Sequence, residues 1–223
     1  MNDRSQMYVG QEASTLAVNK VLRNTYSLLA MTLAFSAVTA TISTMMNLPY
    51  PGFFITIIAY FGLLFGIHKT KDSGMGIVLT FALTGFLGYT LGPLLNMALS
   101  MPGGGEMVAT ALGGTALTFF ATSAYVLTTK KDMSKLGGVI TAGIIMVFVA
   151  MIANFFFQLP ALQLALSALM IPLMAMLIMW QTSDIIHGGE RNYIMATVTL
   201  YVSLYNLFVN LLTLLMAFGG GDE

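Results

Sequence analysis

The 223-residue chain contains no cysteine and little charge of either sign. The lack of cysteine excludes disulfides, thiolate metal ligands and a cysteine nucleophile. Only 8% of the residues are charged, against about 25% in a typical soluble domain. Nine basic and nine acidic residues balance, so no net field attracts a polyanion. This composition cannot cover a water-facing surface, which excludes an ordinary globular enzyme, a nucleic-acid binder and a disordered protein.

Apolar sequence is abundant: 57% of the residues are hydrophobic and the mean hydropathy is +0.83. A membrane-spanning helix needs about 20 apolar residues. Seven stretches are candidates for such spans: 26–46, 52–67, 74–99, 108–128, 139–157, 161–180 and 193–218. The sequence therefore predicts an all-α integral membrane protein, a seven-helix bundle over residues 26–218. Residues 1–25 and 219–223 are predicted to form its N-terminal and C-terminal tails.

The basic residues all fall on one side of the predicted membrane. They lie in the N-terminal tail and in the connections after the second, fourth and sixth spans: Arg4, Lys20, Arg23, Lys69, Lys71, Lys130, Lys131, Lys135 and Arg191. The other three connections contain no lysine or arginine. Because cytoplasmic loops carry the excess of lysine and arginine, the N-terminus is predicted to be cytoplasmic and the C-terminus periplasmic, in an inner membrane.

Ionisable groups other than tyrosine are predicted to lie only in tails, loops and span edges. Intramembrane charges mark ion paths and proton relays, so their absence from the spans argues against a carboxylate-driven pump. A pore built from carbonyls and hydroxyls stays open as an alternative. No serine–histidine pair or cluster of metal ligands is apparent. We therefore expect no catalytic residue, no cofactor and no metal site, and Asp184 with His187 is interpreted as a polar helix end.

The last span carries a polar stripe with steps of four, three, four and three residues, which places its members on one helical face. These members are Thr199, Ser203, Asn206, Asn210 and Thr213. The stripe either lines a wet cavity or forms hydrogen bonds between helices. The second interpretation is favoured because such residues commonly join membrane helices. Both place this helix inside the bundle.

Small and kinking residues mark the third and sixth spans. Gly88 and Gly92 form a small-xxx-small face that favours close helix packing. Pro93 and Pro172 lie inside predicted spans, where proline removes a backbone donor and clashes with the preceding turn. A kink or break is expected at each.

Several motifs in one order resemble the transmembrane Bax inhibitor motif family, and within it the bacterial YccA-type branch. They lie at residues 84–95, 111–120, 123–138, 185–190 and 200–208. The resemblance runs from about residue 19 to residue 218. It implies a seven-helix bundle with the last helix central.

Some family members are calcium leak channels, in which two aspartates on the last two helices form a proton-sensitive latch. The resemblance places these two positions at Gln181 and Ser203. Neither side chain ionises, which argues against a calcium leak of that mechanism. If the chain nevertheless conducts calcium or another cation, the pore-facing groups are predicted to be Gln181, Ser203, Asn206 and Asn210.

The YccA-type branch is associated with the membrane-anchored AAA protease FtsH, which its members occupy as poorly degraded substrates. The predicted function is accordingly a non-enzymatic inner-membrane protein that binds and modulates this protease. Tail 1–25 is a candidate handle for the protease, although the sequence alone favours the alternative that it is simply a solvated terminus. The expected partners are the protease and the lipid bilayer, without nucleic acid. The alternative is a pH-sensitive calcium or cation leak channel.

Overall fold

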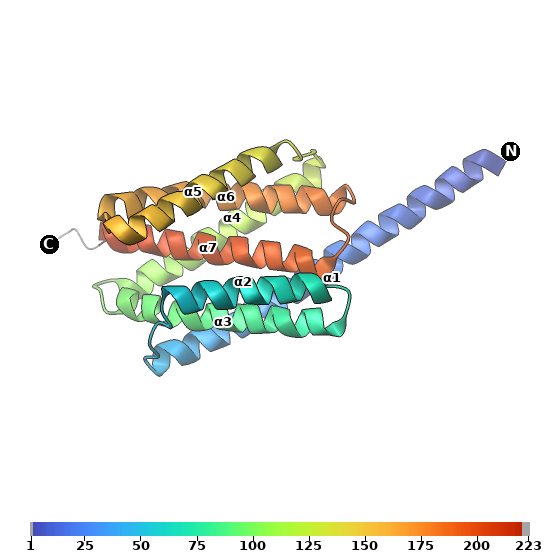
Figure 1. Ribbon diagram of the computed structural model, residues 1–223. Helices are drawn as coiled ribbons and strands as arrows, with labels where there is room; N and C mark the ends of the chain where they lie inside the picture. The colour runs from blue at the N-terminus through green and yellow to red at the C-terminus, as the bar shows by residue number, and fades with distance from the viewer. Residues whose placement is uncertain (1, 220–223) are drawn as a thin grey trace.

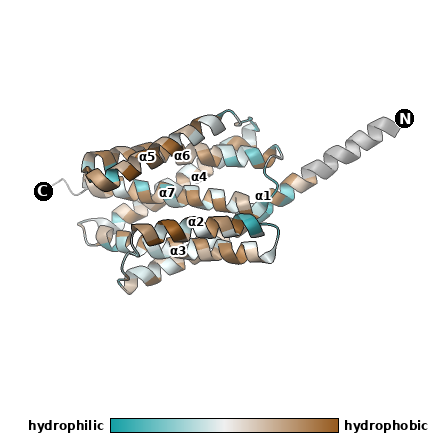
Figure 2. Ribbon diagram, in the orientation of Figure 1, coloured by the Kyte–Doolittle hydropathy of each residue, from teal (hydrophilic) through white to brown (hydrophobic). Residues whose placement is uncertain are grey.

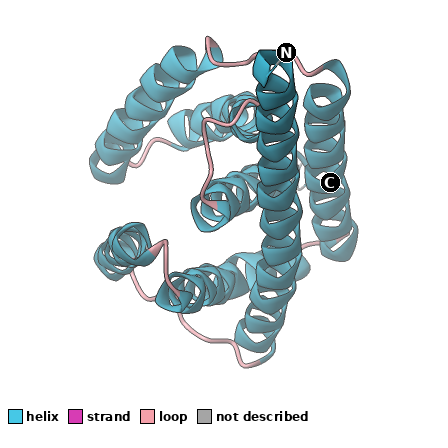
Figure 3. Cartoon of the chain, turned by 90° about the vertical axis from the view of Figure 1, so that its right-hand side faces the viewer, coloured by secondary structure: helices cyan, strands magenta, loops and turns pink. Residues whose placement is uncertain are grey.

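The computed structural model describes residues 2–219, with side chains described from residue 16 onward. Seven α-helices follow one another: α1 (Asn2–Met45), α2 (Phe53–Thr70), α3 (Gly74–Leu99), α4 (Gly104–Thr129), α5 (Leu136–Phe157), α6 (Pro160–Ile186) and α7 (Tyr193–Gly219). All seven are long and apolar enough to cross a membrane. Only helices and connecting loops occur in residues 2–219 (Figure 3). The predicted all-α seven-helix class is confirmed.

Helix α1 is much longer than its predicted span. It runs without interruption from Asn2 to Met45 and projects beyond the bundle at its N-terminal end (Figure 1). At 1.5 Å per residue its length is about 66 Å. The segment contains no proline and only one glycine, Gly10, so nothing in it stops a helix. The predicted boundary at residue 25 therefore lies within a continuous helix, and the cytoplasmic location of residues 1–25 stays a prediction.

Neither of the two intrahelical prolines breaks its helix. Helix α3 continues through Pro93 to Leu99, and α6 continues through Pro172 to Ile186. The loops instead contain the residues with left-handed backbone, where a helix cannot continue: Asn47, Gly52, Gly103, Lys130, Gln158 and Gly188. Of the predicted tail 219–223, Gly219 belongs to α7, and residues 220–223 lie outside the described part of the chain.

Helix α7 occupies the centre of the bundle. It packs against α1, α3, α4 and α6, whereas α2 packs on α3 and α5 packs on α6 at the periphery (Figure 1). Helices α2 and α5 carry many exposed large apolar side chains, and their ribbons are mostly brown, the colour of hydrophobic residues (Figure 2). The prediction that the last helix is central is confirmed.

The apolar core forms where α1, α3 and α6 meet α7. Leu83, Ile178, Leu200 and Leu207 are fully buried in it. Lipid tails are as apolar as leucine, so close packing rather than escape from water holds these side chains inside. The core fixes the orientation of α7 about its own axis, and with it the position of every polar group on that helix.

Candidate functional site

The polar stripe of α7 is satisfied largely within its own helix. The Ser203 hydroxyl donates to the Thr199 carbonyl at 2.7 Å. The Asn206 and Asn210 amides donate to the carbonyls four residues earlier, at 2.8 and 2.7 Å. Thr199 and Thr213 do the same. These hydrogen bonds run within α7 and leave both interpretations of the stripe as predictions, because each asparagine amide keeps its oxygen and a second N–H for a neighbouring helix or for water.

Interhelical hydrogen bonds come instead from tyrosines on another face of α7. The Tyr201 hydroxyl donates to the Thr84 carbonyl at 3.1 Å and lies 2.6 Å from the Ser36 hydroxyl. Since the phenol proton goes to Thr84, the serine hydroxyl donates to Tyr201. The Tyr205 hydroxyl pairs with Thr90 at 2.8 Å. In the sequence these tyrosines only flank the stripe. Their interhelical hydrogen bonds could have been predicted from the rule that a buried phenol hydroxyl needs a hydrogen-bond partner.

Gln181 lies on α6 and is 2% exposed. Its amide nitrogen has no hydrogen-bond partner among the described residues, and neither do the hydroxyls of Ser167 and Thr182 on the same helix. Buried groups of this kind are where ordered water binds. A glutamine amide and a serine hydroxyl stay neutral, so the pair Gln181 and Ser203 cannot reproduce a latch that depends on ionised carboxylates.

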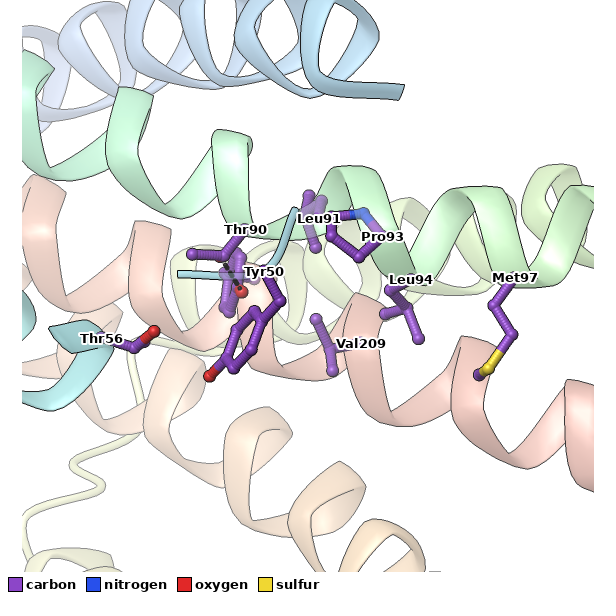
Figure 4. Close-up of a pocket in the computed structure, with 9 residues that line it drawn as sticks. Tyr50, Thr56, Thr90, Leu91, Pro93, Leu94, Met97 and Val209 are labelled. Carbon is purple, nitrogen blue, oxygen red and sulfur yellow. Dashed lines mark hydrogen bonds between the residues drawn. The ribbon is translucent and has the colours of Figure 1, made fainter. Parts of the chain in front are cut away.

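A cavity of about 360 Å³ lies between α3, α7 and the loop from α1 to α2. Tyr50, Thr90, Pro93 and Val209 face it (Figure 4). Tyr205 also lines this space. The predicted pore-facing residues Gln181, Ser203, Asn206 and Asn210 are not among its lining residues. This cavity and the predicted polar stripe therefore belong to different sides of α7.

Gly88 and Gly92 lie where α3 crosses α1. A Cβ atom added at Gly88 would collide with the Thr39 side chain and the Ser36 carbonyl, and one added at Gly92 would collide with Ser43. The Ser43 hydroxyl donates to the Tyr89 carbonyl across the same interface at 2.8 Å. The absence of side chains at these two positions lets the two backbones approach closely.

The C-terminal end of α6 is hydrogen-bonded to the loop between α4 and α5. The Ser183 hydroxyl accepts the Met133 backbone N–H at 2.9 Å, and the His187 imidazole lies 2.8 Å from the Ser183 carbonyl. Gly189 N–H donates to the Asp184 carbonyl at 2.9 Å. Among the described side chains, no group of three or more acids and histidines could hold a metal ion. The geometry is that of a polar helix end tied to a loop.

The fold and the packed last helix define a polytopic helical membrane protein. Residues 18–220 match the model of the family described as "Inhibitor of apoptosis-promoting Bax1". The chain belongs to this Bax inhibitor family.

Its curated relatives include bacterial proteins that match nearly end to end. The chain is 59% identical to the "Modulator of FtsH protease YccA" of Escherichia coli K12, over 91% of this chain and 92% of that protein. It is 56% identical to an uncharacterized protein of Pseudomonas aeruginosa, over 92% of each chain. An uncharacterized membrane protein of Vibrio cholerae is 39% identical, over 93% of this chain and 94% of the relative.

Proposed function

We propose that this chain is an inner-membrane protein that binds the membrane-anchored protease FtsH and modulates it as a poorly degraded substrate. The observation that carries the proposal is the 59% identity, over nine-tenths of both chains, to a protein named as a modulator of that protease. Two features of the molecule support it physically. One is a projecting N-terminal helix, and the other is a bundle that resists extraction.

The projecting part of α1 is suited to be the handle. Residues 2–15 include the charged residues Asp3, Arg4 and Glu12. They precede the predicted span at residues 26–46 and extend beyond the bundle (Figure 1). A protease that pulls on a chain needs such a segment on its own side of the membrane. The one-sided distribution of lysine and arginine supports a cytoplasmic N-terminus.

The bundle opposes extraction because α1 is held in it by close packing and by hydrogen bonds. Gly88 and Gly92 hold α3 close against α1. The Ser36 hydroxyl of α1 pairs with Tyr201 of the central helix. The Thr197 hydroxyl, which bonds to the Tyr193 carbonyl at 2.7 Å, also lies 3.2 Å from the Thr25 carbonyl of α1. Pulling α1 out would break these contacts together. A slowly extracted substrate occupies the protease, and occupancy is the proposed mode of modulation.

Crosslinking in native membranes tests the proposal. The full chain is compared with a deletion of residues 2–15, which leaves the predicted span at residues 26–46 intact, and with a control in which residues 2–15 are scrambled at constant length. We expect the full chain to copurify with FtsH and to slow degradation of a membrane substrate, and the deletion to lose both effects. Equal effects of the full and deleted chains would contradict the handle. Failure of the full chain to crosslink would contradict the partner.

The alternative function, a calcium or cation leak, has less support. Among its four predicted residues, the Ser203 hydroxyl and one N–H of each asparagine amide, Asn206 and Asn210, pair within α7. The buried Gln181 amide nitrogen has no partner among the described residues. Calcium flux into proteoliposomes between pH 6 and pH 8 tests it. A steep pH-dependent flux, lost in Gln181→Leu but kept in Val149→Leu on the exposed face of α5, would favour the channel over the regulator.

A further inference from the structure

A second cavity, of about 740 Å³, lies between α1, α3, α4 and α7. Along α1 its wall runs from Tyr26 to Thr41, and along α4 it runs from Val108 to Phe120. At 1.5 Å per residue these walls are about 18–22 Å long. The hydrocarbon of one leaflet is about 15 Å deep, half of the 30 Å core. The cavity is therefore a slot with the length of a lipid chain.

The slot opens sideways, between α1 and α4. Both helices pack on α7, and the buried residues Leu29, Tyr201 and Phe208 belong to the floor. At the mouth, Leu33 of α1 and Phe120 of α4 are exposed, the latter by 67%. Because these residues belong to membrane-spanning segments, the mouth faces the hydrocarbon layer and not water.

The lining favours an apolar occupant. All of its side chains are uncharged. The floor hydroxyls of Ser36, Tyr201 and Tyr205 already pair within the protein. A buried water needs two to four polar partners, and a peptide segment would bring backbone groups that also need partners. The lining offers these only at one end, so a hydrocarbon chain suits it best.

The polar end of the slot is at Tyr26. The Tyr26 hydroxyl is buried without a hydrogen-bond partner among the described residues, and its ring packs edge-on against Phe119 at 5.9 Å. Arg23 lies three residues before Tyr26 and seven before Ala30, which also lines the slot. Residues at these spacings share one helical face, so the exposed Arg23 continues the wall of the slot toward the membrane surface.

We propose that this slot binds one acyl chain of a membrane phospholipid. The Tyr26 hydroxyl donates to the ester carbonyl of that chain, and the phosphate lies beside the Arg23 guanidinium. Hydrocarbon, ester and phosphate follow one another in a phospholipid, and the slot, Tyr26 and Arg23 follow one another in the same order along α1. The site is independent of the proposed protease modulation.

Photolabelling of the full-length protein in vesicles tests the site. The probe is phosphatidylglycerol with a diazirine at the end of one acyl chain, and labelled residues are mapped by mass spectrometry. We expect labels on the floor residues Leu29, Leu204 and Phe208, which annular lipid cannot reach. Labels confined to exposed residues of α2 and α5 would contradict the proposal.

Filling the mouth provides the matched variants. Ala37→Trp on α1 and Ala116→Trp on α4 place an indole at the entrance, while Val149→Trp places the same side chain on the outer face of α5, where Val149 is exposed. We expect floor labelling to fall at least tenfold in the first two variants and to stay unchanged in the third. Equal floor labelling in all three would overturn the proposal.

Tyr26→Phe and Arg23→Gln test the polar end without filling the slot. Phospholipid retained through purification is counted by native mass spectrometry. Loss of the Tyr26 hydrogen bond is expected to lower retention about fivefold, and Arg23→Lys should retain more phospholipid than Arg23→Gln. Thermal unfolding confirms that each variant is folded. Retention of a free fatty acid without phosphorus, unchanged by Arg23→Gln, would contradict the assigned orientation.

Discussion

Helices α5 and α7 have opposite relations between hydropathy and position. The most apolar window of α5 has a mean hydropathy of 2.5, and 11% of its residues are buried. The corresponding window of α7 has a mean hydropathy of 1.7, and 50% of its residues are buried. In water the more apolar helix would be inside. In a bilayer, lipid tails surround apolar side chains as favourably as the protein interior does. Polar side chains instead face the inside of the bundle, where they find hydrogen-bond partners. Polarity therefore places α7 at the centre.

The two helices also differ in what their buried residues do. Helix α5 buries only Ile140 and Val147 among its described residues. It is attached mainly by packing, and its one described side-chain hydrogen bond to α6, from the Asn154 amide to the Gln163 amide oxygen at 3.2 Å, is exposed. Helix α7 buries Tyr201, whose hydroxyl bonds to α1 and α3, and a serine that bonds to its own backbone. Substitutions in α7 should therefore lower the stability of the bundle by removing both packing and hydrogen bonds, whereas substitutions in α5 should lower it little.

The largest effect is expected where backbones approach most closely. Gly88→Leu would force a side chain into the Ser36 carbonyl and Thr39 of α1, and overpacking of this kind costs about 3 kcal/mol or more. In the control, Gly113→Leu on α4, the added Cβ would meet nothing within 4 Å in the described part of the protein. Thermal unfolding in detergent should show a large loss for the first and almost none for the second. Equal losses would contradict the α1–α3 packing.

A smaller loss is expected from Tyr201→Phe. The change removes the donor to the Thr84 carbonyl and the acceptor for Ser36, at about 1–2 kcal/mol for two interhelical hydrogen bonds. Tyr125→Phe is the control, because Tyr125 is 44% exposed on α4. Unfolding by heat or by denaturing detergent gives the comparison. A Tyr201→Phe protein as stable as Tyr125→Phe would show that the buried phenol does not join the helices.

Two valines of α5 sharpen the comparison within one helix. Val147 is 2% exposed and Val149 is 59% exposed. Val147→Ala leaves a small cavity and should cost about 1 kcal/mol, whereas Val149→Ala exchanges one lipid contact for another and should cost close to nothing. The readout is the difference in unfolding temperature between the two variants. The reverse order would mean that α5 is rotated about its axis.

The sequence was sufficient for the fold because hydropathy and length define spans. Residues 74–99 were predicted as one span and form one helix with the same ends. The sixth span was predicted to end at residue 180, yet α6 continues to Ile186. The missed turn contains Gln181, Thr182 and Ser183, which a hydropathy pattern excludes although all three are buried.

The hydrogen bonds of the candidate site could not be read from local spacing. Tyr201 pairs with Ser36 across 165 residues and with Thr84 across 117, and only the packed bundle brings these groups together. The stripe of Ser203, Asn206 and Asn210 was recognised by its period. Its partners were not, because short polar side chains can bond to the preceding turn as readily as to a neighbouring helix.

The smallest effect is expected outside the membrane, at Asp132 in the loop between α4 and α5. The carboxylate accepts the Ser134 N–H at 2.8 Å, and this hydrogen bond lowers the pKa of Asp132. A lowered pKa in the folded state means that the ionised form contributes stability above the ordinary pKa of about 3.9. That contribution is lost as the pH falls through the lower, folded-state pKa.

Asp132→Asn keeps an acceptor oxygen and removes the ionisation. The variant should therefore unfold at a slightly lower temperature than the parent protein at pH 7, and the difference should vanish below the folded-state pKa. Glu106→Gln, at the opposite end of α4, controls for the loss of one negative charge. A difference that persists unchanged once the pH is below the folded-state pKa would mean that the loop depends on the shape of Asp132 and not on its charge. Acid can act on ionisable groups at such edges, whereas Gln181 and Ser203, the positions to which the family resemblance assigns the latch, carry no carboxylate.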